Sequence, residues 1–291
     1  MLNVPTHDGP PIEPSELWTA WNWDPLVWFG LLAAAAVYRE TWQVTTHRRA
    51  GARWQRRSFV AGMAVVWLAL VSPLDAMGSS LSSAHMVQHL LLTTVAAPLL
   101  VAGAPMITIL RSLPRSLTRR VHRWRMTPAG RAGRWLLANP VAATVPSVVA
   151  LWAWHVPVLY EAAVGNELVH RLEHATFVLT ALVSWAAIVA AGRRRRDRPG
   201  MAVLVLFALS LQCGILGVLL AFSRRPWYPS YATATEQWGL TPLEDQQLAG
   251  VIMWIPAGAV YMVVALVLLS RWIGVGLTGA PHAGSVTVRR P

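Results

Sequence analysis

Seven apolar stretches follow one another along this chain, and they constrain its fold more than any other feature of the sequence. A helix needs about 20 mostly apolar residues to cross the hydrocarbon core of a bilayer. Over the whole chain, 55% of residues are hydrophobic and only 13% are charged, which is typical of a protein that crosses the membrane many times. We therefore expect an all-α, polytopic membrane protein built as a bundle of seven transmembrane helices. The stretches lie at 25–38, 58–72, 84–102, 141–157, 168–191, 201–222 and 246–272.

The net charge of +12 is distributed unevenly between the connections. Arginines gather at 39–57, 111–134 and 192–198 and after the last apolar stretch, whereas the other connections carry acidic residues such as Glu161 and Glu236. Connections rich in arginine face the cytoplasm in most membrane proteins. We therefore expect the N-terminus outside and the C-terminus in the cytoplasm. Topology and contact with anionic membrane lipids account for the positive charge, so no nucleic-acid partner is predicted.

The same patterns predict how the chain is organised. We expect an extracytoplasmic tail at 1–22, a seven-helix membrane domain at 23–273 and a cytoplasmic tail at 274–291. Glycine and proline punctuate residues 103–112, so this segment is predicted to turn into a loop. The long outward connection at 223–244 is expected to lie at the interface, with the alternative that it caps the histidines at 85–89 and 170–174 or contacts a partner.

Two histidine pairs open two of the apolar stretches. His85 precedes His89, and His170 precedes His174, by four residues each. Residues four apart share one face of a helix, so each pair presents two imidazoles on one side. Both stretches run inward, and His155 ends a stretch that runs outward, so all five histidines are expected near the outer surface. Ionisable side chains in membrane spans are costly and mark functional sites. We predict a shared metal site.

Three further side chains are candidates for that site. Asp75 precedes the third stretch, Asp245 opens the seventh, and Met253 follows two turns later. A carboxylate can bind a metal or accept a hydrogen bond from a ligating imidazole. Imidazole suits copper, zinc and iron, whereas a thioether favours Cu(I). Met86 directly follows His85 but points about 100° away from it on a helix. The spacing alone does not separate copper from zinc.

An ordered set of short motifs covers nearly all of the membrane part. They are WDPLVW at 23–28, SPLD at 72–75, HMVQHLLL at 85–92, APLLVAGAP at 97–105, WHVP at 154–157, YEAA at 160–163, HRLEHATF at 170–177 and DQQLAGVIMWIPAG at 245–258. In this set the chain resembles the CtaG family, the seven-span Bacillus-type assembly factors of haem-copper (caa-type) cytochrome c oxidase. The resemblance implies a multi-pass protein of the bacterial plasma (inner) membrane that assists oxidase assembly and is not an enzyme.

The same resemblance implies a role for the histidines. The family is thought to help supply copper to the catalytic subunit of cytochrome c oxidase. An outward-facing imidazole cluster fits this role, because it could accept Cu(I) from an extracytoplasmic copper donor and pass it to a partner. Under this hypothesis the four paired histidines hold the ion, and His155 or a methionine completes or exchanges one position.

Two other functions remain open from the residues alone. The segment HRLEH at 170–174 has the H-x-x-E-H form of an inverted zincin, in which two helical histidines bind zinc and Glu173 acts as general base. The protein would then be an intramembrane zinc metallohydrolase, although HMVQH at 85–89 has Gln88 where the acid would be. Histidines on separate spans are also the ligand arrangement of a b-type haem, with tryptophans lining its pocket.

Overall fold

The computed structural model describes residues 11–45, 52–192 and 198–278, and these ranges form helices without a strand. This confirms the expected all-α class. Of the predicted tails, residues 1–10 and 279–291 lie outside the described residues. The same holds for residues 193–197, which carry most of one predicted arginine cluster.

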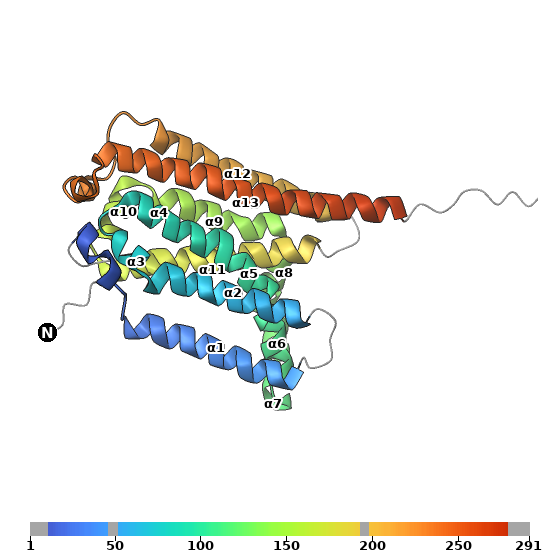
Figure 1. Ribbon diagram of the computed structural model, residues 1–291. Coiled ribbons are helices and arrows are strands. Elements are labelled where there is room, and N and C mark those ends of the chain that lie inside the picture. Colours follow the sequence, from blue (N-terminus) through green and yellow to red (C-terminus); the bar gives the residue numbers. More distant parts are fainter. Residues whose placement is uncertain (1–10, 46–51, 193–197, 279–291) are drawn as a thin grey trace, which may run out of the picture.

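The long helices run side by side in one bundle (Figure 1). Each of the seven apolar stretches overlaps largely with one of these long helices or with a run of shorter helices. A large core lies between α11, α12 and α13, around Trp185, Ile188, Leu206 and Tyr261. The bundle consists of α1 (Pro25–Thr45), α2 (Ala52–Val71), the run α4 (Ser82–Leu90), η2 (Leu91–Ala96) and α5 (Ala97–Ala102), then α9 (Pro140–Trp154), α11 (Glu167–Gly192), α12 (Arg198–Ala221) and α13 (Pro242–Thr278).

Fewer helices than seven meet the length and hydropathy that a membrane span requires. Within the described residues these are Ser82–Ala102, Glu167–Gly192, Gly200–Ala221 and Pro242–Ile273. A fifth is obtained if α8 (Pro128–Ala138) and α9, which meet at a 90° bend, are counted as one broken span. Helix α2 begins with three arginines, and α1 carries Arg39 and Glu40 in its second half, which lowers their mean hydropathy. The count of seven spans and the orientation of the termini stay predictions.

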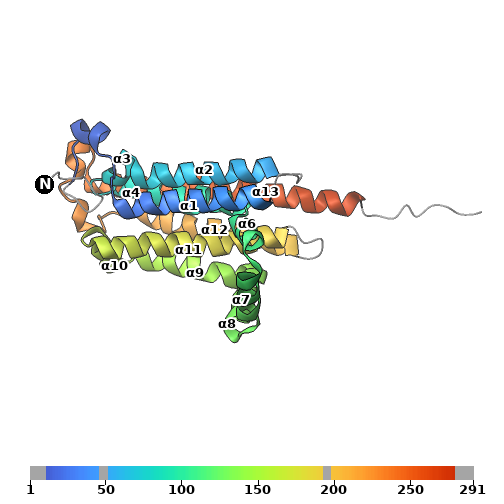
Figure 2. The ribbon, with the colours of Figure 1, turned by 90° about the horizontal axis from the view of Figure 1, so that it is seen from below.

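The two ends of the bundle are built differently. At one end of the bundle, α6, α7 and α8 turn away from the bundle axis, as Figure 2 shows for α7 and α8. Helix α7 contains five arginines of the predicted basic connection and has no buried residue. The end with short helices carries η1 (Pro14–Thr19), α3 (Pro73–Met77), α10 (Pro157–Val164), η3 (Pro229–Tyr231) and η4 (Thr235–Trp238), whereas the opposite end carries α6 (Pro105–Ser112), α7 (Arg115–Met126) and α8.

The expectation of a loop at 103–112 is wrong for most of that segment. Helix α5 ends at Ala102 and is followed by the cap residue Gly103, Ala104 adopts a left-handed backbone conformation with φ of 52°, and α6 begins at Pro105. Proline is favoured in the first turn of a helix because the N–H that it lacks would have no partner there. Here glycine and proline redirect the helix instead of ending helical structure.

The span that carries the first histidine pair changes its winding just after His89. Residues Leu91–Ala96 form a π-helix between α4 and α5. Such segments are rare and occur often at functional sites. One of its carbonyl groups, that of Thr93, accepts a hydrogen bond from the Trp185 indole of α11 at 2.9 Å. The π-helix thereby connects the span of the first histidine pair to the helix of the second.

Candidate metal site

Two helices bring four histidines and one glutamate together inside the bundle. His85 and His89 come from α4, and His170, Glu173 and His174 come from α11. The ring centroids lie 4.1 Å apart for His85 and His89, 4.2 Å for His170 and His174, 5.0 Å for His89 and His174, and 5.6 Å for His85 and His170. All except His174 are buried. The structure thus brings both predicted pairs into one group, which we call the histidine cluster.

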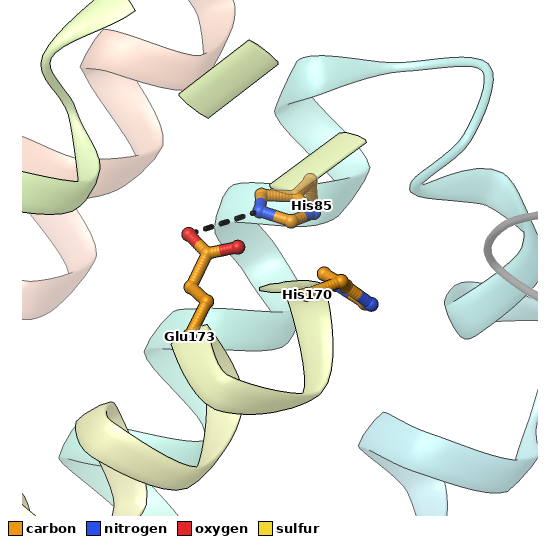
Figure 3. A group of neighbouring side chains, drawn as sticks. All are labelled: His85, His170 and Glu173. Carbon is orange, nitrogen blue, oxygen red and sulfur yellow. Dashed lines mark ion pairs between the residues drawn. The ribbon is translucent and has the colours of Figure 1, made fainter. Parts of the chain in front are cut away.

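Glu173 lies in the middle of the histidine cluster. One of its carboxylate oxygens is 3.8 Å from Nε2 of His85 and 3.9 Å from Nε2 of His89. Figure 3 shows its carboxylate turned toward His85, with His170 beside them, and one ligand atom from each of these three residues lies within 4.8 Å of the others. Nitrogen and carboxylate oxygen atoms at this spacing are a suitable ligand set for a metal ion.

The hydrogen bonding of these side chains also indicates a metal site. Neither oxygen of Glu173 and neither nitrogen of His89 has a hydrogen-bond partner among the described residues. Buried polar atoms are almost always hydrogen-bonded, so such a group calls for an explanation. A cation between the carboxylate and the imidazoles would satisfy these atoms together and offset the cost of burying a negative charge.

Sequence reasoning did not identify Glu173 as a candidate metal ligand. The H-x-x-E-H pattern predicted this residue only as the general base of a hydrolase. The signal was nevertheless present in HRLEH, because a residue three positions after His170 shares its helix face. What the sequence could not show is that this face is directed toward His85 and His89.

The two predicted aspartates lie outside the histidine cluster. Asp75 accepts hydrogen bonds from the side-chain amides of Asn22, at 2.7 Å, and Gln88, at 2.6 Å. Gln88 lies on α4 between the two cluster histidines, so Asp75 fixes the rotation of that helix. In this structure its carboxylate serves as a hydrogen-bond acceptor that positions α4.

Asp245 stabilises the start of the same helix. Its carboxylate accepts four hydrogen bonds, from the backbone N–H and the hydroxyl of Ser82 and of Ser83, over 2.5–3.1 Å. The residue before α4, Leu81, has no side chain that could cap the helix. Helix α13 therefore supplies the cap, and the negative charge also suits the positive end of the helix dipole.

His155 lies at the edge of the histidine cluster, where α9 ends. Its Nδ1 is 2.6 Å from the carbonyl oxygen of Leu151, and its Nε2 is 3.4 Å from the sulfur of Met86. Met253, the remaining candidate from the sequence, is buried on α13 in the same apolar group as Met86. His155 and the methionines thus form a separate set of potential ligands beside the cluster.

Tyrosines cover the cluster on the side that faces the end of the bundle with the short helices. The ring centroid of Tyr160 lies 5.5 Å from that of His85, and the Tyr228 ring stacks on the Tyr160 ring with 3.7 Å between their centroids. The Tyr228 hydroxyl donates to the His155 carbonyl at 3.1 Å, and that of Tyr231 donates to the Gly78 carbonyl at 3.0 Å. Burial raises the pKa of Tyr228 and Tyr231 above the ordinary range, so both stay protonated and act as donors. The connection at 223–244 therefore caps the cluster instead of lying only at the interface.

These features define an all-helical membrane protein with a buried histidine and glutamate cluster near one end of its bundle. The chain belongs to the cytochrome c oxidase caa3 assembly factor family (Caa3_CtaG), because the model of that family matches residues 35–274. This confirms the resemblance in the short motifs. The comparisons give no support to the hydrolase or haem alternatives.

Three mycobacterial proteins described as uncharacterized are similar to this chain. Mb0105 of Mycobacterium bovis and MT0111 of Mycobacterium tuberculosis are each 27% identical to it over 271 residues, and ML1998 of Mycobacterium leprae is 26% identical over 275. Each match covers 87% of this chain, but the chain spans only about two fifths of the length of these curated relatives, 39% or 40%. No solved structure matches the chain.

Proposed function

We propose that this protein supports the assembly of haem-copper cytochrome c oxidase by binding Cu(I) in the histidine cluster and delivering it to the catalytic subunit. The observation that carries this proposal is the convergence of four imidazoles and the Glu173 carboxylate in the bundle interior. Imidazole alone suits several metals. The oxidase assembly family favours copper among them, because the oxidase needs copper at its catalytic centre.

The position of the cluster suits delivery from outside. Both histidine pairs lie near the start of their helices, at the end of the bundle where the acidic connections gather. The distribution of arginine supports an orientation in which this end faces the outer side of a bacterial plasma membrane. An extracytoplasmic donor could then load the site, and the catalytic subunit, itself a membrane protein, could receive the ion within the bilayer plane.

Glu173 has a specific part in this proposal. Three or four neutral imidazoles leave the charge of a bound cation uncompensated, which is costly in a membrane interior. The carboxylate offsets that charge. The copper ion is the cargo of the protein, so its ligands must release it as well as hold it, and imidazoles that exchange one at a time meet this requirement.

Metal binding of the purified protein tests the first half of the proposal. We expect the histidine cluster to hold one tightly bound Cu(I) when the detergent-solubilised protein is loaded with one equivalent, measured by competition with a chromophoric Cu(I) chelator. The double variants His85→Ala/His89→Ala and His170→Ala/His174→Ala should each lose it. His122→Ala is the matched control, because His122 is exposed on α7, and it should bind as wild type does. Unchanged copper binding in both double variants would refute the site.

Delivery needs a second measurement. The oxidase is isolated from cells that express either the wild-type protein or one double variant, and its copper content per haem is determined. We expect a loss of copper from the catalytic subunit with each double variant at equal protein level. Normal copper content would contradict delivery while leaving copper binding intact. If the purified protein instead hydrolysed a membrane peptide, and if zinc restored this activity after metal removal, the metallohydrolase function would be favoured.

A further inference from the structure

A cavity of about 80 Å³ extends from the histidine cluster toward the middle of the bundle. His89 lines it at one end, and Thr94, Trp185 and Tyr261 line it deeper along the helices. Met86, His155, Met253 and Cys213 also contribute to its wall. The wall therefore contains two thioethers, one thiol and two imidazoles, which are the side chains that bind soft metal ions.

Within this wall, Met86 and His155 face each other in an unusual way. The carbonyl oxygen of Leu151 can only accept a hydrogen bond, so the Nδ1 atom of His155 that contacts it carries the proton. In the neutral imidazole the Nε2 atom then presents a lone pair. It lies 3.4 Å from the Met86 sulfur, which has no proton to donate. Two buried electron-pair donors thus point at each other.

A soft cation would resolve this arrangement. Metal sites in proteins have ligand distances of about 2.3 Å to sulfur and about 2.0 Å to an imidazole nitrogen, as known for zinc, and a near-tetrahedral angle then separates the two ligand atoms by roughly 3.5 Å. The distance between the Met86 sulfur and His155 Nε2 is 3.4 Å. The pair is therefore already at the spacing of two ligands on one ion.

The surroundings restrict which ion fits. Both side chains are buried, with 1% of Met86 and 4% of His155 exposed. The described part of the cavity wall contains no carboxylate, unlike the histidine cluster with Glu173. A thioether and an imidazole without a carboxylate favour a soft monovalent ion over zinc or iron.

We infer that Met86 and His155 form a second Cu(I) site beside the histidine cluster, to which the ion passes from the cluster. This inference rests on the proposed function. His89 lines the same cavity and belongs to the cluster, so it connects the two sites. In the transfer, the bonds from copper to the cluster ligands break one after another while bonds to the Met86 sulfur and the His155 nitrogen form. Copper remains Cu(I), and no electron or proton is exchanged.

X-ray absorption spectroscopy of protein labelled with selenomethionine tests this inference without changing the site. The protein is loaded with one and then two equivalents of Cu(I), and the copper edge is analysed for selenium neighbours. We expect only light-atom neighbours at one equivalent and a copper–selenium contact at two. Met86→Leu should remove that contact and limit binding to one equivalent. Leucine preserves the volume and apolar character of the side chain, so the fold should tolerate it.

Met262→Leu is the matched control. Met262 lies on α13, as Met253 does, but it faces outward with 48% of its surface exposed. It should retain both equivalents and the selenium contact. His155→Gln gives a second variant of the same site, and it should lose the second equivalent as Met86→Leu does.

The outcomes separate this inference from the proposed function. One bound equivalent with light-atom neighbours only, even in excess Cu(I), would overturn the second site and leave the histidine cluster as a copper site. A selenium contact that persists in Met86→Leu would also overturn it. Failure of the wild type to bind any Cu(I) would overturn the proposed function itself.

Discussion

Glu173 and Asp245 are both buried carboxylates, and their different partners give them different roles. The Glu173 carboxylate faces imidazole nitrogens at 3.8 and 3.9 Å and has no hydrogen bond to a described residue. Asp245 accepts four hydrogen bonds from two serines. The first carboxylate is available to a metal ion, and the second is occupied in holding a helix.

Replacing Glu173 with glutamine should weaken Cu(I) binding without unfolding the protein. The amide has the shape of the acid but not its charge, so the bound cation is no longer compensated. We expect the Cu(I) dissociation constant to rise roughly tenfold or more, as is typical when a supporting group of a metal site is removed. Chelator competition measures it. An unchanged affinity would mean that the imidazoles alone determine binding.

Replacing Asp245 with alanine should destabilise the fold. Two backbone N–H groups at the start of α4 and two hydroxyls would lose their acceptor, and we expect a cost of about 1–3 kcal/mol. Thermal unfolding in detergent, followed by circular dichroism, measures the change. Glu236→Ala is the control, since Glu236 is an exposed acid in the preceding connection. Equal stability of both variants would show that the cap contributes nothing.

The candidate site was predictable from the sequence only where helical periodicity determines it. The spacing of four between His85 and His89 places both on one face, and the structure has them so. The roles of Asp75 and Asp245 depend on partners far away in the chain, such as Asn22 and Ser82. No local pattern indicates such partners.

Among the helices, α12 and α13 approach each other closely where two glycines meet. A Cβ atom added to Gly250 would lie 2.5 Å from the carbonyl oxygen of Gly217 and 2.6 Å from the backbone nitrogen of Ala221. Both obstacles are backbone atoms, which cannot move aside as a flexible side chain would. The absence of side chains here allows the two helices to pack over a long distance.

Gly250→Ala should therefore destabilise the bundle by about 1–3 kcal/mol, the usual cost of overpacking. Gly30→Ala is the control, because a Cβ atom at Gly30 on α1 meets nothing within 4 Å. That substitution should leave stability unchanged or raise it, since alanine favours helix more than glycine does. Unfolding in detergent compares the two. A Gly250→Ala protein as stable as wild type would indicate that α12 and α13 separate without cost.

The helices of the bundle were predictable because long apolar stretches form helices in a membrane, whereas the elements at 105–138 were not. There, prolines open α6 and α8 at their first turns, and the same residues indicate a loop when only the sequence is considered. The presence of a helix also does not determine whether that helix crosses the membrane. Arginines within α2 permit a helix but lower its hydropathy below that of a span.

At the scale of the whole molecule, the two ends of the bundle differ in charge and architecture. The end with α7 is rich in arginine, and the end with the histidine cluster carries the acidic connections and the tyrosine cover. The positive-inside rule predicts that the first end faces the cytoplasm. Copper would then enter the protein from outside the cell.

Thiol labelling tests this orientation. In a Cys213→Ala background, Gln237→Cys and Ser116→Cys place one exposed cysteine at each end of the bundle. A membrane-impermeant maleimide added to intact cells should label Gln237→Cys and should label Ser116→Cys only after permeabilisation. The reverse pattern would place the histidine cluster on the cytoplasmic side and require a cytoplasmic copper donor.

The cap that Asp245 supplies to α4 also has a consequence for the timing of biosynthesis. The ribosome makes Ser82 and Ser83 about 160 residues before the aspartate that completes their first helical turn. A nascent chain that still lacks α13 has both histidine pairs but not the group that fixes the start of the first one. We therefore expect both histidine pairs to be synthesised well before the start of α4 receives its cap, so that the cluster becomes fully ordered only after α13 has entered the bundle.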